Sequence, residues 1–403
     1  MAHFFALLLV VVQVKPTLPP PVNFDARWAT AFETLPAAQP GYDATTAYVP
    51  LKGGAPTIRT PAAPGTPTAP LTEIKMMPPE LVAVDLDRGT IRWRIEATTT
   101  LTPATGGGLV FTVDEDVIEA RDTATGALTW KASLPGGAAA PLYFDTGWLL
   151  ASTPAGDLAA FRASDGVLVW RKQLGSRLAG PPGPALDRLV LPLADNRLVS
   201  VLLVNGETVW ELHLDAAITG MLALDDQVVF GTAAKNLTSV ESTRGRQRWT
   251  WRLGGDLAGI PAADDKRIFF ASRDNLLRAV DRRSGNLRWK ADLGARPAGG
   301  PLRLTNALMM PARPDGPQRL TDALVMPLVS NQIIGFDPET GNPAIAATAA
   351  GEIGLQPYVR RDARQTLPQL ITVSREGQLQ GFGRRFEPVP QLLGELPGAP
   401  AVP

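Results

Sequence analysis

The stretch LRAVDRRSGNLRW, residues 277–289, is the unit that this chain repeats. Its leucine begins a short apolar stretch, and a small residue lies two positions before an aspartate. A glycine four positions after the aspartate reverses the chain towards the tryptophan. Internal similarity at one fixed period marks a repeat architecture, and here the glycine recurs about every 40 residues. Its copies are Gly89, Gly126, Gly166, Gly206, Gly245, Gly285 and, after a longer gap, Gly341.

A tryptophan follows each of the first six glycines by four residues, and an orphan copy precedes them. These residues are Trp28, Trp93, Trp130, Trp170, Trp210, Trp249 and Trp289. The position two before the aspartate is small in all eight copies: Ala83, Ala120, Ala160, Ser200, Ser239, Ala279, Gly335 and Gly381. We interpret the small residue as room for a ring from the adjoining copy, because stacked repeats must fill space at the density of a protein interior. The tryptophans are therefore predicted to dock each repeat onto the next.

Each complete repeat contains four short apolar stretches, which in the sixth copy are GIPAA, RIFFAS, LLRAVD and LRWKADL. Short stretches bounded by Asp-Asn, Asp-Lys and Ser-Gly turn signals, without a helical period, predict β-strands. Four strands in about 40 residues are typical of a β-propeller blade. Pro192 and Pro327 lack the N–H that a central strand needs, so a bulge or strand end is expected at each.

The two ends of the repeat array are complementary fragments. WATAF, at residues 28–32, has the pattern of a last strand with no repeat before it, whereas residues 369–385 supply earlier strands of an eighth repeat that lacks its tryptophan strand. Pairing the two would remove an exposed sheet edge. The sequence therefore predicts an all-β fold: an eight-bladed β-propeller of four-stranded antiparallel blades, closed by an N-terminal strand that pairs with the C-terminal blade.

The predicted propeller spans residues 22–386, between an apolar and Pro-rich segment at 1–21 and a Pro-rich tail at 387–403. Residues 53–79 are dense in Pro, Thr, Ala and Gly and are predicted to form a disordered loop inserted in blade 1. A second insertion, residues 303–318, falls in blade 7.

Blade 7 departs from the repeat in two ways. RLTNALMMP at 303–311 is nearly duplicated as RLTDALVMP at 319–327. We expect the second copy to form the blade strand and the first to loop out. Ile345 stands where a tryptophan is expected, so the contact with blade 8 is predicted to be weaker.

The apolar run at residues 4–14 has the length of a secretory signal core and is too short to span a bilayer. No basic residue precedes it and no clear cleavage site follows, so an unstructured apolar start or a wrongly chosen start codon is the alternative. Without any cysteine, the chain is not expected to be lipid-anchored as a bacterial lipoprotein. A periplasmic or secreted location is the favoured prediction.

Composition excludes several classes of function. The chain has no cysteine, and its two histidines, His3 and His213, are too few and too far apart for a histidine metal cluster. No Ser-His-acid arrangement can be proposed from them. Lys+Arg and Asp+Glu are equal at 39, which gives no net field to attract nucleic acid. We expect no catalytic, cofactor-binding or metal-binding residues, no stable transmembrane helix and a monomer.

A concentration of arginines in the fifth and sixth repeats is the candidate partner-binding site. Strand alternation places Arg246, Arg248 and Arg252 on the face opposite Trp249 and Trp251. With arginines of the next blade they could form a basic rim for an acidic partner. A solvated edge that discourages strand addition explains the same residues and is preferred. The candidates are Arg246, Arg248, Arg252, Arg282, Arg283 and Arg288.

The motif leucine-x-small-x-aspartate-x-x-Thr/Ser-glycine-x-x-x-tryptophan, as in IEARDTATGALTW and LRAVDRRSGNLRW, resembles the pyrroloquinoline-quinone-like (PQQ-like) β-propeller repeat. That family contains quinoprotein dehydrogenases, which hold a quinone and calcium in the central funnel, and non-catalytic propellers. This chain is more similar to the non-catalytic branch that includes the outer-membrane protein assembly factor BamB family. The resemblance implies a periplasmic adaptor for protein partners; the missing lipobox cysteine is a departure.

Two functional hypotheses follow. The favoured one is a non-enzymatic, extracytoplasmic scaffold for protein–protein interaction, in the cell envelope or in outer-membrane protein assembly. The alternative is a propeller that binds PQQ and calcium or another small ligand in its funnel, related to the quinoprotein dehydrogenases.

Overall fold

The structure is a computed structural model that describes residues 22–55, 76–311, 318–360 and 368–384. The predicted segments at 1–21 and 387–403 and the centre of the predicted loop at 53–79 lie outside the described residues. All regular elements of the described part are β-strands.

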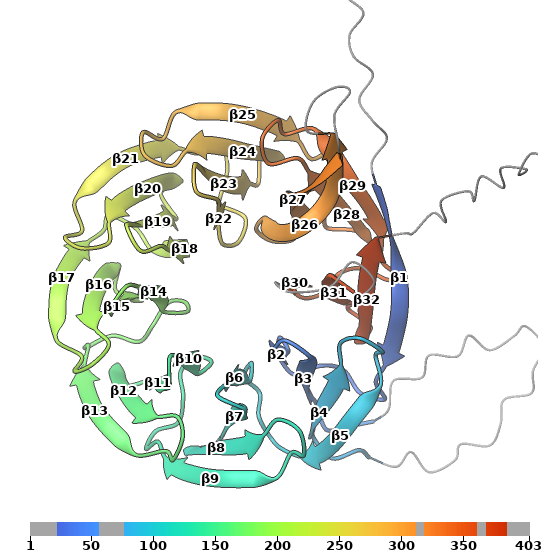
Figure 1. The fold of residues 1–403 in the computed structure, drawn as a ribbon. Helices are drawn as coiled ribbons and strands as arrows, with labels where there is room; N and C mark the ends of the chain where they lie inside the picture. Colours follow the sequence, from blue (N-terminus) through green and yellow to red (C-terminus); the bar gives the residue numbers. More distant parts are fainter. Residues whose placement is uncertain (1–21, 56–75, 312–317, 361–367, 385–403) are drawn as a thin grey trace, which may run out of the picture.

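Eight four-stranded antiparallel blades surround a central axis, which confirms the predicted fold class (Figure 1). The first strand of each blade lies innermost and the fourth lies at the outer rim. The strands of blades 1 to 4 are β2 Gly41–Tyr42, β3 Thr46–Leu51, β4 Glu80–Asp85 and β5 Ile91–Glu96; β6 Ala104–Gly106, β7 Leu109–Asp114, β8 Val117–Asp122 and β9 Leu128–Ser133; β10 Tyr143–Asp145, β11 Trp148–Ser152, β12 Asp157–Arg162 and β13 Leu168–Gln173; β14 Gly183–Ala185, β15 Arg188–Pro192, β16 Arg197–Leu202 and β17 Thr208–His213. Those of blades 5 to 8 are β18 Ile218–Ala223, β19 Gln227–Thr232, β20 Asn236–Glu241 and β21 Gln247–Arg252; β22 Ala262–Ala263, β23 Arg267–Ser272, β24 Leu276–Asp281 and β25 Leu287–Asp292; β26 Leu302–Pro311, β27 Gln318–Pro327, β28 Gln332–Phe336 and β29 Pro343–Thr348; β30 Tyr358–Val359, β31 Leu370–Val373, β32 Gln378–Arg384 and β1 Val22–Ala31.

Strand β1 closes the ring by pairing with two blades. It runs antiparallel to β32 of blade 8, with Trp28 opposite Gly381 and Thr30 opposite Leu379. Its first residues, Val22 and Asn23, also pair in parallel with β29 of blade 7. The last two blades therefore form one eight-stranded sheet, and both of their outer edges are hydrogen-bonded.

The hydrophobic core consists of separate layers, one between each pair of neighbouring blades. Phe111 and Leu149, for example, meet between blades 2 and 3, and Phe269 and Met326 meet between blades 6 and 7. Similar clusters fill the other junctions. Each blade thus buries both of its faces against other blades, as expected for repeats that cannot bury their apolar faces alone.

The tryptophans contact the next blade through both the ring and the indole nitrogen. The ring of Trp130 lies against Gly166 of blade 3, where an added Cβ would come within 2.5 Å of the ring. Its Nε1 donates a hydrogen bond of 3.0 Å to the carbonyl oxygen of Ala163. The same bond joins Trp28, Trp93, Trp170, Trp210, Trp249 and Trp289 to the blade that follows each of them.

The small residue of the repeat has a different neighbour from the one predicted. Ala120 pairs across the strands with Trp130 of its own blade, and Ala279 pairs with Trp289 in the same way. The ring from the adjoining blade packs instead on the turn glycine. The small residue is needed because a side chain directly opposite would occupy the space of the ring.

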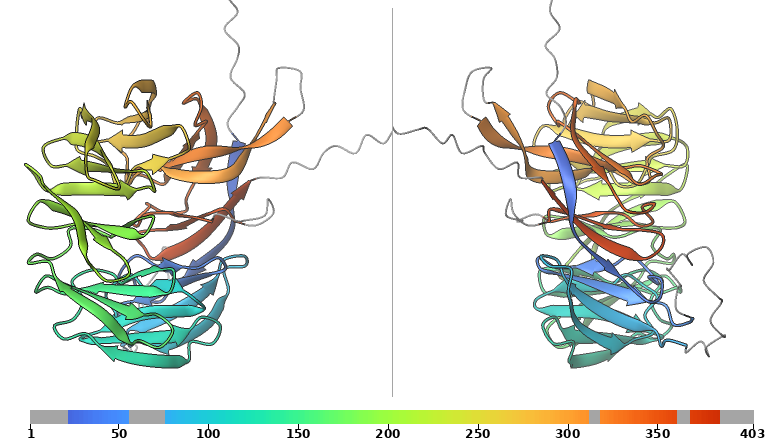
Figure 2. Two further views of the ribbon diagram at one scale, coloured as in Figure 1. Left: turned by 60° about the vertical axis from the view of Figure 1, so that its left-hand side comes forward. Right: turned by 90° about the vertical axis from the view of Figure 1, so that its right-hand side faces the viewer.

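Blade 7 corrects one further expectation. The first copy of the duplicated sequence does not loop out: it forms the ten-residue strand β26, which pairs antiparallel with β27. The two copies make a hairpin that projects from one face of the ring, hereafter the hairpin face (Figure 2). At the junction of blades 7 and 8, Ile345 stands in place of an indole and strand β1 pairs with β29. The weaker contact there stays a prediction. The two prolines end strands β15 and β27, as predicted.

Replacing Trp28 by alanine should lower the unfolding temperature more than replacing Trp170. Each substitution removes a ring of the kind whose loss costs about 3 kcal/mol. Only Trp28→Ala also loosens the strand that closes the ring. Thermal unfolding followed by circular dichroism measures the difference, and equal losses for the two variants would contradict this role of strand β1.

Candidate functional site

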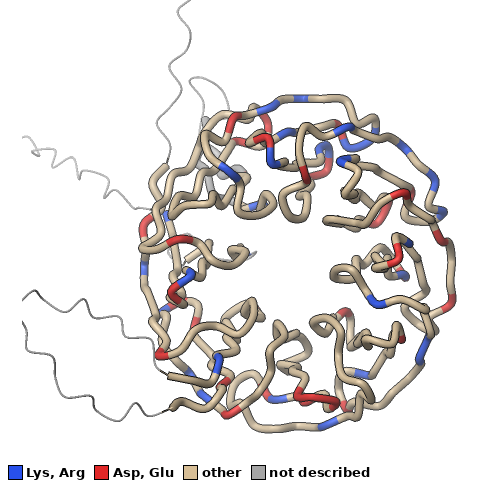
Figure 3. Tube along the Cα trace, turned by 180° about the vertical axis from the view of Figure 1, so that it is seen from behind, with Lys and Arg blue, Asp and Glu red and all other residues tan. Residues whose placement is uncertain are grey.

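The described residues offer no metal centre at the axis. They contain no group of three or more His, Cys, Asp or Glu side chains that could hold a metal ion. The innermost strands β2, β6, β14 and β22 contain only uncharged residues. Charged residues of both signs are instead distributed around the ring (Figure 3). These innermost strands therefore do not provide the acidic ligands of a calcium-assisted quinone site.

A large charged groove lies between blades 6 and 7, where the β26–β27 hairpin leaves the ring. It encloses about 1010 Å³. The residues that line it are Asp264, Asp265, Lys266, Arg267, Asp281, Arg282, Arg283, Arg288, Arg303, Asp322, Asp337, Pro338 and Glu339. Turns between first and second strands and between third and fourth strands supply most of them, so the groove opens on the hairpin face.

Several ion pairs fix the walls of the groove. Arg267 binds Asp264 through two nitrogens, at 2.9 and 2.7 Å. Arg303 of β26 binds Asp322 of β27 at 2.7 Å and also contacts the carbonyl oxygen of Ala263 in blade 6. The base of the hairpin is thus attached to the neighbouring blade as well as to its own.

The predicted arginines fall into three environments. Arg282, Arg283 and Arg288 line the charged groove, whereas Arg246 and Arg248 lie on blade 5. Arg252 is at the other end of β21, where it binds the carbonyl oxygen of Ala234 at 2.7 Å. A strand rises about 3.3 Å per residue, so this end lies roughly 15 to 20 Å from the hairpin face.

Asp226 connects two of these arginines across the blade boundary. Its carboxylate accepts a hydrogen bond of 3.0 Å from Arg248 of blade 5 and another from Arg282 of blade 6. Partial burial opposes ionisation of this carboxyl, but the two arginines lower its pKa overall. Arg246 is paired with Glu241 at 3.4 Å, and Arg288 with Asp281 at 2.5 Å. Four of the six arginines, Arg246, Arg248, Arg282 and Arg288, are therefore paired with acids.

Four exposed charges of the groove have no ion-pair partner within the described residues. They are Asp265, Lys266, Arg283 and Glu339, two of each sign. Sequence reasoning singled out Arg283 but missed the others. In the sequence, Asp265 and Lys266 give only a turn signal, and Glu339 belongs to the turn of the repeat that lacks its tryptophan.

The chain is a β-propeller built from eight copies of one repeat, seven of which carry the docking tryptophan. Two matches to the family described as outer membrane protein assembly factor BamB cover residues 79–221 and 204–354, and the chain belongs to this family. A comparison with the sequences of curated proteins finds no match. Within the described residues there is no helix of sufficient length and apolarity to cross a membrane.

Solved structures with the same fold include three with low sequence identity. BamB from Moraxella catarrhalis has a TM-score of 0.59 and 14% identity, covering 89% of this chain and 99% of that one. The computationally designed Ika8 protein has a TM-score of 0.62 and 10% identity, covering 88% of this chain and 98% of that one. Sqt1 from Saccharomyces cerevisiae has a TM-score of 0.62 and 10% identity, covering 91% of this chain and 99% of that one. At such identities the similarity establishes the fold alone.

Asp281 should contribute stability that is lost in acid. The hydrogen bond from Arg288, with backbone and hydroxyl bonds from Ser284, holds the pKa of this carboxyl well below its ordinary value of 3.8. A lowered folded-state pKa means that the contribution is complete above the unfolded pKa and declines as the pH falls below about 4. Asp281→Asn should therefore be less stable than the unaltered chain at neutral pH, and the gap should close towards pH 2.

Urea unfolding at a series of pH values measures this gap. Asp265→Asn is the matched control, because it removes an exposed groove carboxylate that has no ion-pair partner; it should change stability little. A gap for Asp281→Asn that stays constant down to pH 2 would show that the carboxylate charge is not what stabilises the turn.

Proposed function

We propose that this chain is a non-enzymatic scaffold that binds protein partners in the cell envelope, in outer-membrane protein assembly. Family membership supports the class of partner and the periplasmic or secreted location. The observation that carries the proposal is the charged groove beside the projecting hairpin, because it combines a rigid base with exposed charges that have no partner in the described chain.

The groove suits a protein partner better than a small ligand or nucleic acid. Its unpaired charges are mixed in sign, so they would orient a partner with a complementary pattern instead of attracting one kind of polyion. The anchored arginines Arg267 and Arg303 keep the walls in place before binding, which reduces the cost of ordering side chains. In this proposal Arg282, Arg283 and Arg288 are contact residues, and Arg246, Arg248 and Arg252 belong to the neighbouring surface.

Reversing the positive charges of the groove should release the partner. The test variant is Lys266→Glu with Arg283→Glu, and the control is Arg273→Glu with Arg296→Glu, which makes the same charge change beyond the opposite ends of the strands. A photo-crosslinking residue at position 339, in the groove, or at position 256, near Arg273 at the opposite ends of the strands, then captures neighbours in intact cells. We expect a reproducible crosslink to an envelope protein from position 339 that the groove variant weakens by about tenfold.

Equal crosslinking from positions 339 and 256, or equal loss in the two double variants, would refute the groove as the contact surface. Both variants should keep the circular dichroism spectrum of the unaltered chain, because all four side chains are exposed and none forms an ion pair within the described residues.

The quinone alternative has a direct test. We expect that purified protein mixed with PQQ and calcium, then passed over a desalting column, retains no quinone absorbance, because the innermost strands listed above bring no acidic ligands to the axis. Retention of one quinone per chain, with a shifted absorbance spectrum, would favour the alternative over the scaffold.

A further inference from the structure

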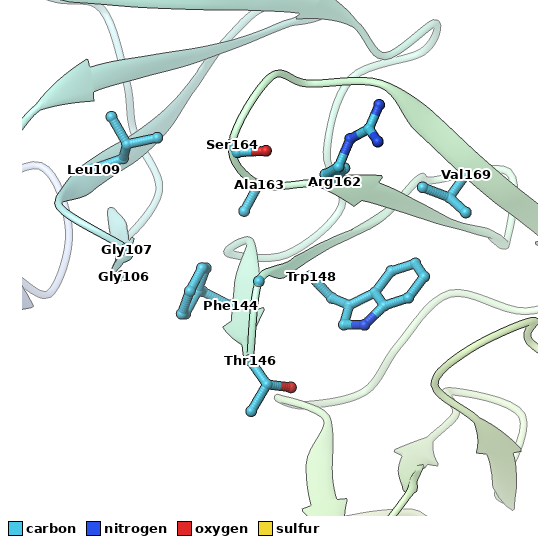
Figure 4. Close-up of a pocket in the computed structure, with 11 residues that line it drawn as sticks. Gly106, Gly107, Leu109, Phe144, Thr146, Trp148, Arg162, Ala163, Ser164 and Val169 are labelled. Carbon is cyan, nitrogen blue, oxygen red and sulfur yellow. The ribbon is translucent and has the colours of Figure 1, made fainter.

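A second cavity, separate from the charged groove, lies between blades 2 and 3 and is mostly apolar. It encloses about 600 Å³, a volume typical of sites that bind small ligands or protein side chains. Its walls include Gly106 and Gly107 of blade 2 and Phe144, Trp148 and Arg162 of blade 3 (Figure 4). We call it the aromatic pocket. Like the charged groove, it is formed at turns of the hairpin face.

The pocket is held open by a close contact between two blades. The ring of Phe144 lies on Gly106, where an added Cβ would be 2.1 Å from a ring carbon. The same ring stacks on Phe111 with centroids 5.9 Å apart and an interplanar angle of 14°. Phe144 is therefore fixed before anything binds, and the glycines beside it leave space where side chains would otherwise stand.

Trp148 differs from the docking tryptophans. Each docking indole donates its N–H to a carbonyl oxygen of the next blade, as Trp130 does to Ala163. Within the described residues, the Nε1 of Trp148 has no acceptor, although one side of the ring packs on the cluster between blades 3 and 4. A half-buried indole with an unused donor is typical of a binding surface, where tryptophan presents a large apolar area and one polar atom.

Arg162 replaces an acidic residue of the repeat. At the same register position, blades 1, 2, 5, 6 and 7 carry an aspartate or glutamate: Asp85, Asp122, Glu241, Asp281 and Asp337. Blade 4 carries the uncharged Leu202. In blade 2 the residue caps its turn by accepting the N–H of Thr125. In blade 3 a cation stands there instead, and Asp165 binds the turn and the Nε of Arg162 at 2.9 Å.

The guanidinium of Arg162 remains available for a ligand. Only its Nε is bound, and its two terminal nitrogens have no partner within the described residues. The pair with Asp165 is solvent-exposed, with side chains 55% and 45% accessible, so it holds the arginine weakly. Arg162 is also the only charged residue in the pocket lining. A carboxylate that approaches the pocket would meet a positive charge with free donors.

From these features we infer that the aromatic pocket binds an aromatic side chain carried on an acidic segment of a partner protein. The ring would lie against Phe144 on the side of blade 3 that faces blade 2. The flanking segment would cross the turn at Thr146 and Gly147, contact Trp148 and pair a carboxylate with Arg162. The other residues of the lining are uncharged, so a positively charged segment gains nothing there. This site is independent of the charged groove, and either can fail its test without the other.

Short peptides of defined sequence test this inference. The probe is a fluorescein-labelled, end-blocked Glu-Phe-Glu peptide, compared with Glu-Ala-Glu and Gln-Phe-Gln, and binding is followed by fluorescence polarisation. We expect Glu-Phe-Glu to bind most tightly. Trp148→Leu and Arg162→Asp should each weaken it about tenfold, through loss of aromatic contact and through charge reversal.

The two variants are chosen to fold. Leu109 and Asp122 occupy these register positions in blade 2, so each substitution copies a residue that the repeat already accommodates. Arg177→Asp is the control, because it makes the same charge change at an exposed site in the loop between strands β13 and β14. It should bind Glu-Phe-Glu as the unaltered chain does, and thermal unfolding shows whether each variant is folded.

Five results would overturn the inference. They are no binding of Glu-Phe-Glu at millimolar concentration, equal binding of Glu-Ala-Glu, equal binding of Gln-Phe-Gln, unchanged binding by folded Arg162→Asp or Trp148→Leu, and an equal loss in Arg177→Asp.

Discussion

The contact of an indole ring with a turn glycine of the next blade is the interaction on which the ring depends. Gly166 shows why the residue recurs: its φ of 73° lies in the left-handed region, and a Cβ there would collide with Trp130. The left-handed backbone and the close approach of the ring both require glycine at this position. The indole N–H then satisfies a carbonyl of the same turn. Packing and hydrogen bonding thus set the position of each blade relative to the next.

Because this interaction is repeated, the sequence predicts the architecture well. A glycine and a tryptophan four residues apart reveal each blade, and the tryptophan at position 28, without a repeat before it, reveals the closing strand. The prediction failed where it depended on which ring neighbours which residue. Ala120 is opposite the tryptophan of its own blade, and spacing alone does not distinguish a partner within the blade from one in the next.

The functional surface was harder to predict, for a physical reason. Arginines are visible in a sequence, but their partners come from turns of other blades. Asp226 of blade 5 joins Arg248 to Arg282 of blade 6, more than 50 positions later. The duplicated sequence in blade 7 gives no indication that its copies pair with one another, because the same residues can form one strand and a loop. Such outcomes are decided by tertiary contacts, which override local preference.

Comparison of the eight repeats with one another also distinguishes residues that maintain the fold from residues that are available for binding. A residue that recurs at one register position serves the repeat, as the acidic cap of the turn does in five of the blades. A departure that a neighbour compensates, such as Ile345 beside strand β1, preserves the fold. Arg162 departs from the cap and gains only a weak, exposed pair, while Trp148 leaves a donor unused. Stable repeats do not need such residues, and sites where local rules fail are where binding is expected.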